Sequence, residues 1–144
     1  MLTVDSSIVI AAPVERVFDY VADYRNATTW MRNFSRFEPV GEKAYGLGAR
    51  SLVEGTILGV PFRTELQVVE FVRCSRLTSR STGSLRSLSR WLFKPVANGT
   101  EVSFSAQYQP PRVIPGPEPA RHLLQRELRK GAEQSLLNLK RAIE

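Results

Sequence analysis

The sequence predicts an α+β fold in which a run of antiparallel strands is followed by one long helix. Between Phe34 and Gln109 the chain reads as about six short strands separated by turn residues. From about Ala120 to Ile143, apolar residues recur at steps of three and four, which is the period of an amphipathic helix. Consecutive strands followed by a helix indicate an antiparallel sheet, and the helix must bury its apolar stripe against the concave face of that sheet.

The N-terminal part predicts a strand over Thr3–Ile10 and a helix over Pro13–Ala22. Proline in the first helical turn loses no hydrogen bond and has a suitable φ angle already. Glu15 lies in the same turn, where the positive end of the helix dipole stabilises its negative charge. One apolar face of this helix contains Val14, Val17, Phe18 and Val21. A short second helix or turn is expected over Tyr24–Trp30.

Turn residues divide the central part of the chain into strands. The expected strands are Phe34–Val40, Gly48–Leu58, Val60–Val72, Arg76–Thr82, Leu85–Lys94 and Thr100–Gln109. Gly59, with Pro61 beside it, marks a tight connection. Asn98-Gly99 is the strongest hairpin signal in the sequence.

The last two strands alternate clearly, and this assigns their faces. The positions expected to face the interior are Leu85, Ser87, Ser89, Trp91, Phe93, Val102, Phe104, Ala106 and Tyr108. Arg86, Arg90 and Lys94 fall on the opposite face, together with Glu101, Ser103 and Ser105. We therefore expect a basic and polar outer surface here.

The segment Pro110–Pro119 is rich in proline, so it predicts an ordered or semi-rigid loop rather than a helix or strand. The helix that follows carries an apolar stripe formed by Leu124, Leu128, Ala132, Ser135, Leu136, Leu139 and Ile143. Gly131 lies within this helix, where glycine destabilises the helix by about 1 kcal/mol relative to alanine. We expect the glycine to permit the close approach of another segment or of a ligand.

Composition restricts the class of protein. A chain of 144 residues is consistent with one domain over residues 1–144. With a single cysteine and a single histidine, an intramolecular disulfide is excluded, and we expect no metal site and no cofactor. No signal peptide or membrane-spanning segment is apparent, so we expect a cytoplasmic protein. The net charge of +6 comes from 20 basic and 14 acidic residues.

Several segments in order resemble the START-like (SRPBCC) superfamily, the polyketide cyclase/dehydrase and lipid-transport group. The matching segments are Ala12–Phe18, Asp23, Trp30, Val68–Phe71, Trp91–Phe93, Gly99–Val102 and Leu136–Lys140. The resemblance covers essentially the whole chain. It implies a helix-grip fold, with a curved antiparallel sheet of about seven strands around the long C-terminal helix and two short helices after the first strand.

The resemblance also implies a hydrophobic cavity between sheet and helix. Without it, the aromatic residues fit a filled core as well as a binding pocket. With it, we expect a lipid, polyketide or quinone-like ligand. The predicted wall consists of Phe62, Leu66, Trp91, Phe93, Phe104 and Tyr108, and the predicted helical floor of Leu124, Leu128 and Ala132. The small residues Ser87, Ser89 and Ala106 would leave room, and Val113 and Ile114 would form a lid or portal.

A cyclase or dehydratase using the same cavity is an alternative, although no catalytic residue can be assigned. The carboxylates Glu54, Glu65 and Glu70 would need to line the cavity. We expect them instead to face water or to pair with arginines such as Arg50 and Arg63. His122 is expected on the surface of the long helix, and Cys74 is expected to be structural.

A third alternative is an interaction module that binds RNA or an anionic membrane through the outer basic face. That face would present Arg76, Arg80, Arg86, Arg90 and Lys94. The lack of exposed aromatic residues among these charges disfavours nucleic acid. The sequence leaves the ligand, the oligomeric state and a partner for the basic face open.

Overall fold

The structure is a computed structural model that describes residues 2–83, 86–109 and 118–144. Within these residues the elements are β1 (Leu2–Ile10), α1 (Val14–Ala22), η1 (Tyr24–Asn26), α2 (Ala27–Trp30), β2 (Phe34–Pro39), β3 (Arg50–Ile57), β4 (Val60–Val72), β5 (Arg76–Gly83), β6 (Arg86–Val96), β7 (Gly99–Gln109) and α3 (Glu118–Ile143). This order confirms the predicted α+β class.

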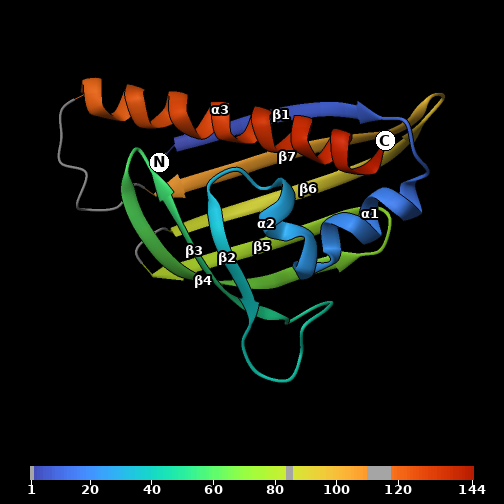
Figure 1. The fold of residues 1–144 in the computed structure, drawn as a ribbon, viewed down its shortest axis with the longest axis horizontal. Coiled ribbons are helices and arrows are strands. Elements are labelled where there is room, and N and C mark those ends of the chain that lie inside the picture. The colour runs from blue at the N-terminus through green and yellow to red at the C-terminus, as the bar shows by residue number, and fades with distance from the viewer. Residues whose placement is uncertain (1, 84–85, 110–117) are drawn as a thin grey trace.

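The described strands form one seven-stranded antiparallel sheet in the order β1-β7-β6-β5-β4-β3-β2. The sheet curves strongly, and α3 lies along it beside β1, with α1 and α2 over the same side (Figure 1). Gln125 donates a hydrogen bond to the Thr3 carbonyl at 3.0 Å, and Lys140 donates one to the Val9 carbonyl at 3.1 Å. These bonds hold α3 along β1, which confirms the expected helix-grip arrangement.

The junction between β1 and α1 forms as expected. Pro13 is the N-cap residue of α1, and Val17 and Phe18 on the apolar face are buried. The Phe18 ring packs edge-on against Phe93 at 5.0 Å and against Phe71 at 5.3 Å between ring centroids. Helix α1 therefore covers the sheet at the end where these two rings lie.

The hairpin between β6 and β7 differs from the prediction by one residue. Its turn is Ala97–Asn98, and Gly99 is already the first residue of β7, paired with Val96. Gly99 has a φ of +139°, and a Cβ atom there would lie 2.1 Å from the Ile10 carbonyl oxygen. Glycine is thus required both by this positive φ and by the close approach of β7 to the end of β1.

The two faces of the sheet agree with the alternation in β6 and β7. Phe93, Trp91, Val102, Phe104 and Ala106 are buried, and the described outward positions of β6 are exposed. Leu85 lies outside the described residues, as do Val113, Ile114 and nearly all of the proline-rich segment. No helix in the described part of the chain is long and apolar enough to cross a membrane.

Candidate ligand-binding pocket

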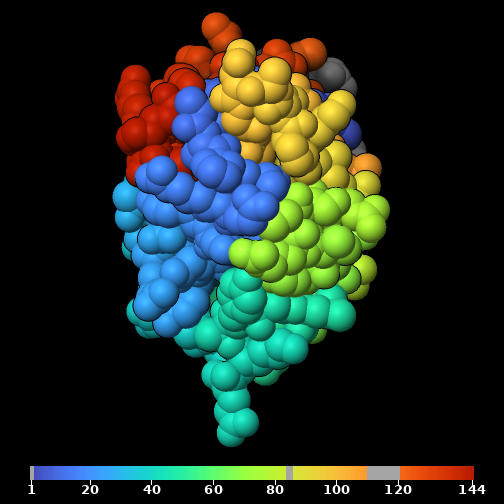
Figure 2. Space-filling view, turned by 90° about the vertical axis from the view of Figure 1, so that its right-hand side faces the viewer, coloured from blue at the N-terminus to red at the C-terminus, as the bar shows by residue number. Residues whose placement is uncertain are grey.

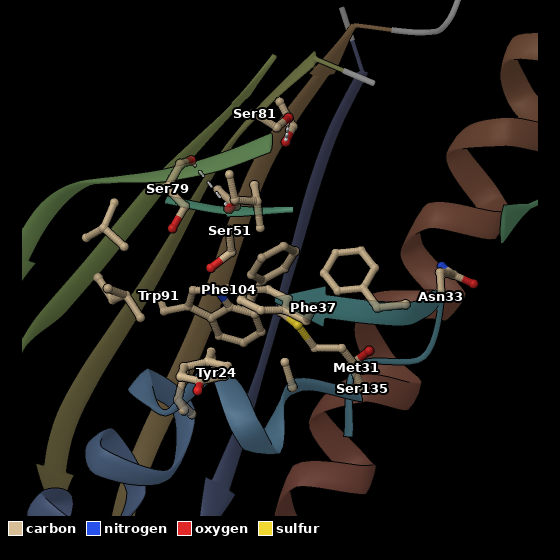
Figure 3. Close-up of a pocket in the computed structure, with 18 of the residues that line it drawn as sticks. Tyr24, Met31, Asn33, Phe37, Ser51, Ser79, Ser81, Trp91, Phe104 and Ser135 are labelled. Carbon is tan, nitrogen blue, oxygen red and sulfur yellow. Dashed lines mark hydrogen bonds between the residues drawn. The ribbon is translucent and has the colours of Figure 1, made fainter. Parts of the chain in front are cut away.

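A pocket lies between the concave face of the sheet, the segment from α1 to β2, and α3. Its cavity volume is about 160 Å³. Figure 3 shows the strand side of the pocket with Ser51, Ser79, Ser81, Trp91 and Phe104, and the opposite side with Ser135 of α3. The wall contains many apolar side chains, and the described lining also includes the hydroxyl groups of six serines, one threonine and three tyrosines.

Most of the predicted site residues line this pocket. The lining includes Phe62, Leu66, Trp91, Phe104 and Tyr108 from the sheet, and Leu128 and Ala132 from α3. The small residues Ser87 and Ser89 line it too, whereas Ala106, the cross-strand partner of Ser89, is buried and is not part of the lining.

Phe93 and Leu124 are buried but do not belong to the pocket lining. Phe93 lies one inward position beyond Trp91 on β6, where Phe18 of α1 covers it. Leu124 lies in the turn of α3 that packs on β1, next to the bond from Gln125. Both side chains therefore fill core positions at the ends of the hollow.

Aromatic rings form the apolar end of the pocket. Trp30 and Trp91 meet edge to face with ring centroids 5.2 Å apart, and the ring centroids of Trp91 and Phe104 are 4.3 Å apart. Phe34 and Phe62 meet at 5.9 Å on another part of the wall. Trp30 and Trp91 are the two tryptophans of the chain, and both line the pocket. Their fluorescence and their indole N–H signals therefore report directly on this site.

The segment between α2 and β2 closes the pocket toward α3. The backbone N–H of Arg32 donates to Ser135 at 2.9 Å, and Asn138 donates to the Trp30 carbonyl at 3.2 Å. A Cβ atom on Gly131 would lie 2.7 Å from the side-chain nitrogen of Asn33. The glycine predicted to allow a close approach thus faces Asn33, itself a lining residue.

The three candidate carboxylates lie outside the pocket and are paired. Glu54 accepts a hydrogen bond from Arg36 at 3.0 Å, and Glu65 lies 3.2 Å from Arg50. Glu70 accepts one from Thr78 at 2.8 Å and lies 3.6 Å from Arg76. His122 is exposed on α3, and neither it nor Cys74 lines the pocket. These groups are not positioned to act on a molecule in this pocket.

The basic outer face lies on the convex side of the sheet, away from the pocket. Arg76, Arg80, Arg86, Arg90 and Lys94 are all exposed there. Their charge is partly balanced, because Arg76 and Arg90 lie within 4.0 Å of Glu70 and Lys94 is the cross-strand partner of Glu101.

Tyr108 on β7 is a half-buried titratable group of the pocket lining. Its hydroxyl makes no hydrogen bond to any residue that the structure describes. Burial raises the pKa of Tyr108 to about 12. The side chain is therefore a neutral hydrogen-bond donor and acceptor at physiological pH, and not a base.

We expect Tyr108→Phe to reduce the loss of stability at high pH. Burial favours the neutral phenol in the folded state. The contribution of Tyr108 to the free energy of unfolding is therefore complete below the ordinary pKa of 10.0 and is lost as pH rises toward about 12. The expected effect on the free energy of unfolding is up to about 2 kcal/mol. Urea unfolding of wild type and Tyr108→Phe between pH 9 and pH 12 measures it, with the exposed Tyr45→Phe as control. Parallel pH profiles for wild type and Tyr108→Phe would contradict the assignment.

The sequence analysis missed the lining contributed by η1, by the segment between α2 and β2, and by β2, β3 and β5. These residues include Tyr24, Met31, Asn33, Phe34, Phe37, Ser51 and Ser79. The aromatic residues of Phe34–Phe37 were a usable signal, since two rings in an otherwise polar short strand need a buried surface. The serines of β3 and β5 gave no such signal, because serine is common on either face of a strand.

The family model described as polyketide cyclase/dehydrase and lipid transport matches residues 1–144. No curated protein sequence matches the chain significantly. Among solved structures, TTHA0849 from Thermus thermophilus superposes with a TM-score of 0.83 at 23% identity, covering 98% of this chain and 96% of that one.

Two further similar structures are aromatase/cyclases. The Zhui aromatase/cyclase from Streptomyces sp. R1128 gives a TM-score of 0.79 at 13% identity, with 98% of this chain and 92% of that chain covered. The di-domain ARO/CYC BexL from the BE-7585A biosynthetic pathway gives 0.76 at 19% identity, with 99% and 50% covered. At these identities the similarities establish the fold.

Proposed function

The chain belongs to the polyketide cyclase/dehydrase and lipid transport family, and from this premise we propose that it binds a hydrophobic or amphipathic small molecule in the pocket between the sheet and α3. Residues 1–144 would act as one binding domain. Lining residues from the predicted set would contact the ligand, namely Phe62, Leu66, Trp91, Phe104, Tyr108, Leu128 and Ala132.

The unfilled volume of the pocket is the observation that supports this proposal most strongly. Protein cores pack about as densely as organic crystals and leave few voids larger than one water molecule. The volume of about 160 Å³ is large enough for on the order of ten waters. A hollow of this size, walled by aromatic and aliphatic side chains, favours an apolar occupant over water.

The pocket also reaches solvent. Tyr45, in the loop between β2 and β3, lines it and is 49% exposed. Its ring packs against Phe71 at 5.2 Å, so the loop is tied to the wall. Figure 2 shows this loop protruding from the body of the protein as a narrow projection. A ligand entering beside Tyr45 would reach the aromatic end first.

Native mass spectrometry of freshly purified protein, compared with a denatured sample, tests the proposal. We expect a reproducible bound mass that disappears on denaturation, or, for protein purified empty, binding of the neutral dye N-phenyl-1-naphthylamine with quenching of tryptophan fluorescence. Protein that carries no bound mass and also leaves the dye unbound would refute the proposal.

A second candidate is catalysis of a cyclisation or dehydration in the same pocket, and the hydroxyl of Tyr108 is the observation that favours it. As a neutral donor it could hydrogen-bond to a substrate carbonyl and polarise it. The similarity to aromatase/cyclases is consistent with such a substrate. If the protein catalyses such a reaction, Tyr108→Phe should abolish turnover of a candidate polyketide substrate, while that substrate still binds.

A further inference from the structure

The concave face of the sheet changes from polar to aromatic along the strand direction. At the hairpin end of β5 and β6, cross-strand pairing places five inward residues side by side, in the order Tyr108, Ser87, Ser81, Leu66 and Ser51. We call this set the hydroxyl row. The next inward positions on the two central strands, Ser79 and Ser89, extend its polar character.

Further along the strands the same face becomes apolar. Cross-strand pairing there aligns Phe104, Trp91, Leu77 and Phe71, which we call the aromatic row. Figure 3 shows Ser51, Ser79 and Ser81 on one part of the sheet, and Trp91 and Phe104 on the next. A molecule lying along the strands would therefore meet hydroxyl groups at one end and rings at the other.

Several of these hydroxyls lack a protein partner. Ser51 is only 7% exposed, lines the pocket, and makes no side-chain hydrogen bond to any residue described by the structure. Ser79 and Tyr108 are half-buried and also line the pocket, and their hydroxyls make no hydrogen bond to a residue within the described ranges. Ser81 and Ser87, by contrast, bond to each other at 2.7 Å. Because the three hydroxyls of Ser51, Ser79 and Tyr108 line the pocket and bond to no described residue, each is free to hydrogen-bond to a molecule held there.

The charges around the pocket restrict what that partner can be. Among the described lining residues Arg32 alone carries a full charge, and it is 41% exposed and lies 3.6 Å from Glu127. The nearby carboxylates face outward and are paired. An ionised group beside the hydroxyl row would meet no opposite charge among the described lining residues there to offset the hydration that it loses, which is unfavourable.

From these observations we infer that the pocket selects a ligand with a neutral hydroxyl or carbonyl group at one end and an aromatic or aliphatic body. The polar group lies against the hydroxyl row, and the body lies over the aromatic row. The inference rests on the proposed function, because it names the chemical class of ligand for the same pocket.

Three probes of one shape test this inference: naphthalene, 2-naphthol and 2-naphthoate, the last being anionic at neutral pH. Binding is followed by the two indole N–H cross-peaks of Trp30 and Trp91 in ¹H–¹⁵N spectra. An unbonded buried hydroxyl would weaken 2-naphthol about five- to 150-fold relative to naphthalene. Hydrogen bonds from the serines should instead make 2-naphthol about two- to tenfold tighter than naphthalene, with 2-naphthoate the weakest.

A pair of variants assigns the effect to the hydroxyl row. Ser51→Ala removes the unpartnered serine hydroxyl of this row and should lower the affinity for 2-naphthol about two- to tenfold while leaving naphthalene unchanged. Ser105→Ala, on the convex face of β7, is the control and should change neither. Binding of naphthalene more tightly than 2-naphthol, or preference for 2-naphthoate, would overturn the inference and leave the proposed function standing. Failure of all three probes to bind would count against both the inference and the proposed function.

Discussion

Replacement of Gly55 by alanine is expected to lower the free energy of unfolding by about 3 kcal/mol or more. A Cβ atom at this position would lie 1.9 Å from the backbone carbonyl oxygen of Asn33 and 2.9 Å from the Phe62 ring. Gly55 has no unusual φ angle, so the requirement for glycine is one of space alone.

Relaxation at this point is restricted because the clashing atom belongs to the backbone. The Asn33 carbonyl accepts a hydrogen bond from the N–H of Thr56 at 3.1 Å, where the pairing of β2 with β3 shifts register. The preceding residue, Arg32, is held by α3 through the bond from its backbone N–H to Ser135. Moving Asn33 away from Gly55 would therefore strain contacts to both β3 and α3.

Urea unfolding followed by tryptophan fluorescence measures this effect. Gly48→Ala is a matched control, because Gly48 has a φ of +86° but no atom within 4 Å of the added Cβ. It carries only the backbone cost of about 1–2 kcal/mol. If Gly55→Ala were no more destabilising than Gly48→Ala, the close approach of Asn33 to β3 would be wrong.

The sequence was sufficient for the fold because each element has its own local signal. The strands β6 and β7 alternate strictly, and α3 carries a continuous apolar stripe. Pro13 begins α1 at the position expected for proline. Errors were confined to element ends such as the β6–β7 turn, where Gly99 is already the first residue of β7 and closely approaches Ile10. That approach is a tertiary contact, which local patterns do not contain.

The pocket lining was less predictable than the fold, because irregularities in strand pairing decide which face of the sheet a side chain occupies. In β4, Leu66 and Val68 face the pocket, and strict alternation would place Glu70 beside them. The pairing of β4 with β5 instead shifts register between Val68 and Glu70, so Phe71 lines the pocket and Glu70 bonds to Thr78. One bulge thus replaces a carboxylate by a ring and decides the chemistry of this wall.

The division between core and pocket is equally a tertiary property. Phe93 and Trp91 are two residues apart on the same face of β6, and both are buried. Phe18 of α1 covers Phe93, whereas Trp91 borders the hollow. Alternation identifies both residues as inward, but only the docking position of α1 distinguishes them.

Filling the pocket from the sheet side is expected to abolish most ligand binding without unfolding the protein. Ser89 lines the pocket in the centre of β6, and its cross-strand neighbours, Ser79 and Ala106, are both small. A leucine at position 89 would therefore extend into the hollow rather than into packed side chains. The hydroxyl that is lost makes only a long bond of 3.5 Å to the Ser79 carbonyl, so the change should cost little stability.

We expect Ser89→Leu to weaken the binding of N-phenyl-1-naphthylamine and of naphthalene at least about tenfold, because a ligand and the new side chain compete for the same space and overpacking costs about 1–3 kcal/mol. The free energy of unfolding should stay within about 1 kcal/mol of wild type or rise, since the leucine buries apolar surface. Ser105→Leu, on the exposed face of β7, is the control for the added leucine and should bind both probes normally. Unchanged binding by a folded Ser89→Leu protein would mean that these probes bind elsewhere, and a ligand site between the sheet and α3 would then have to be abandoned.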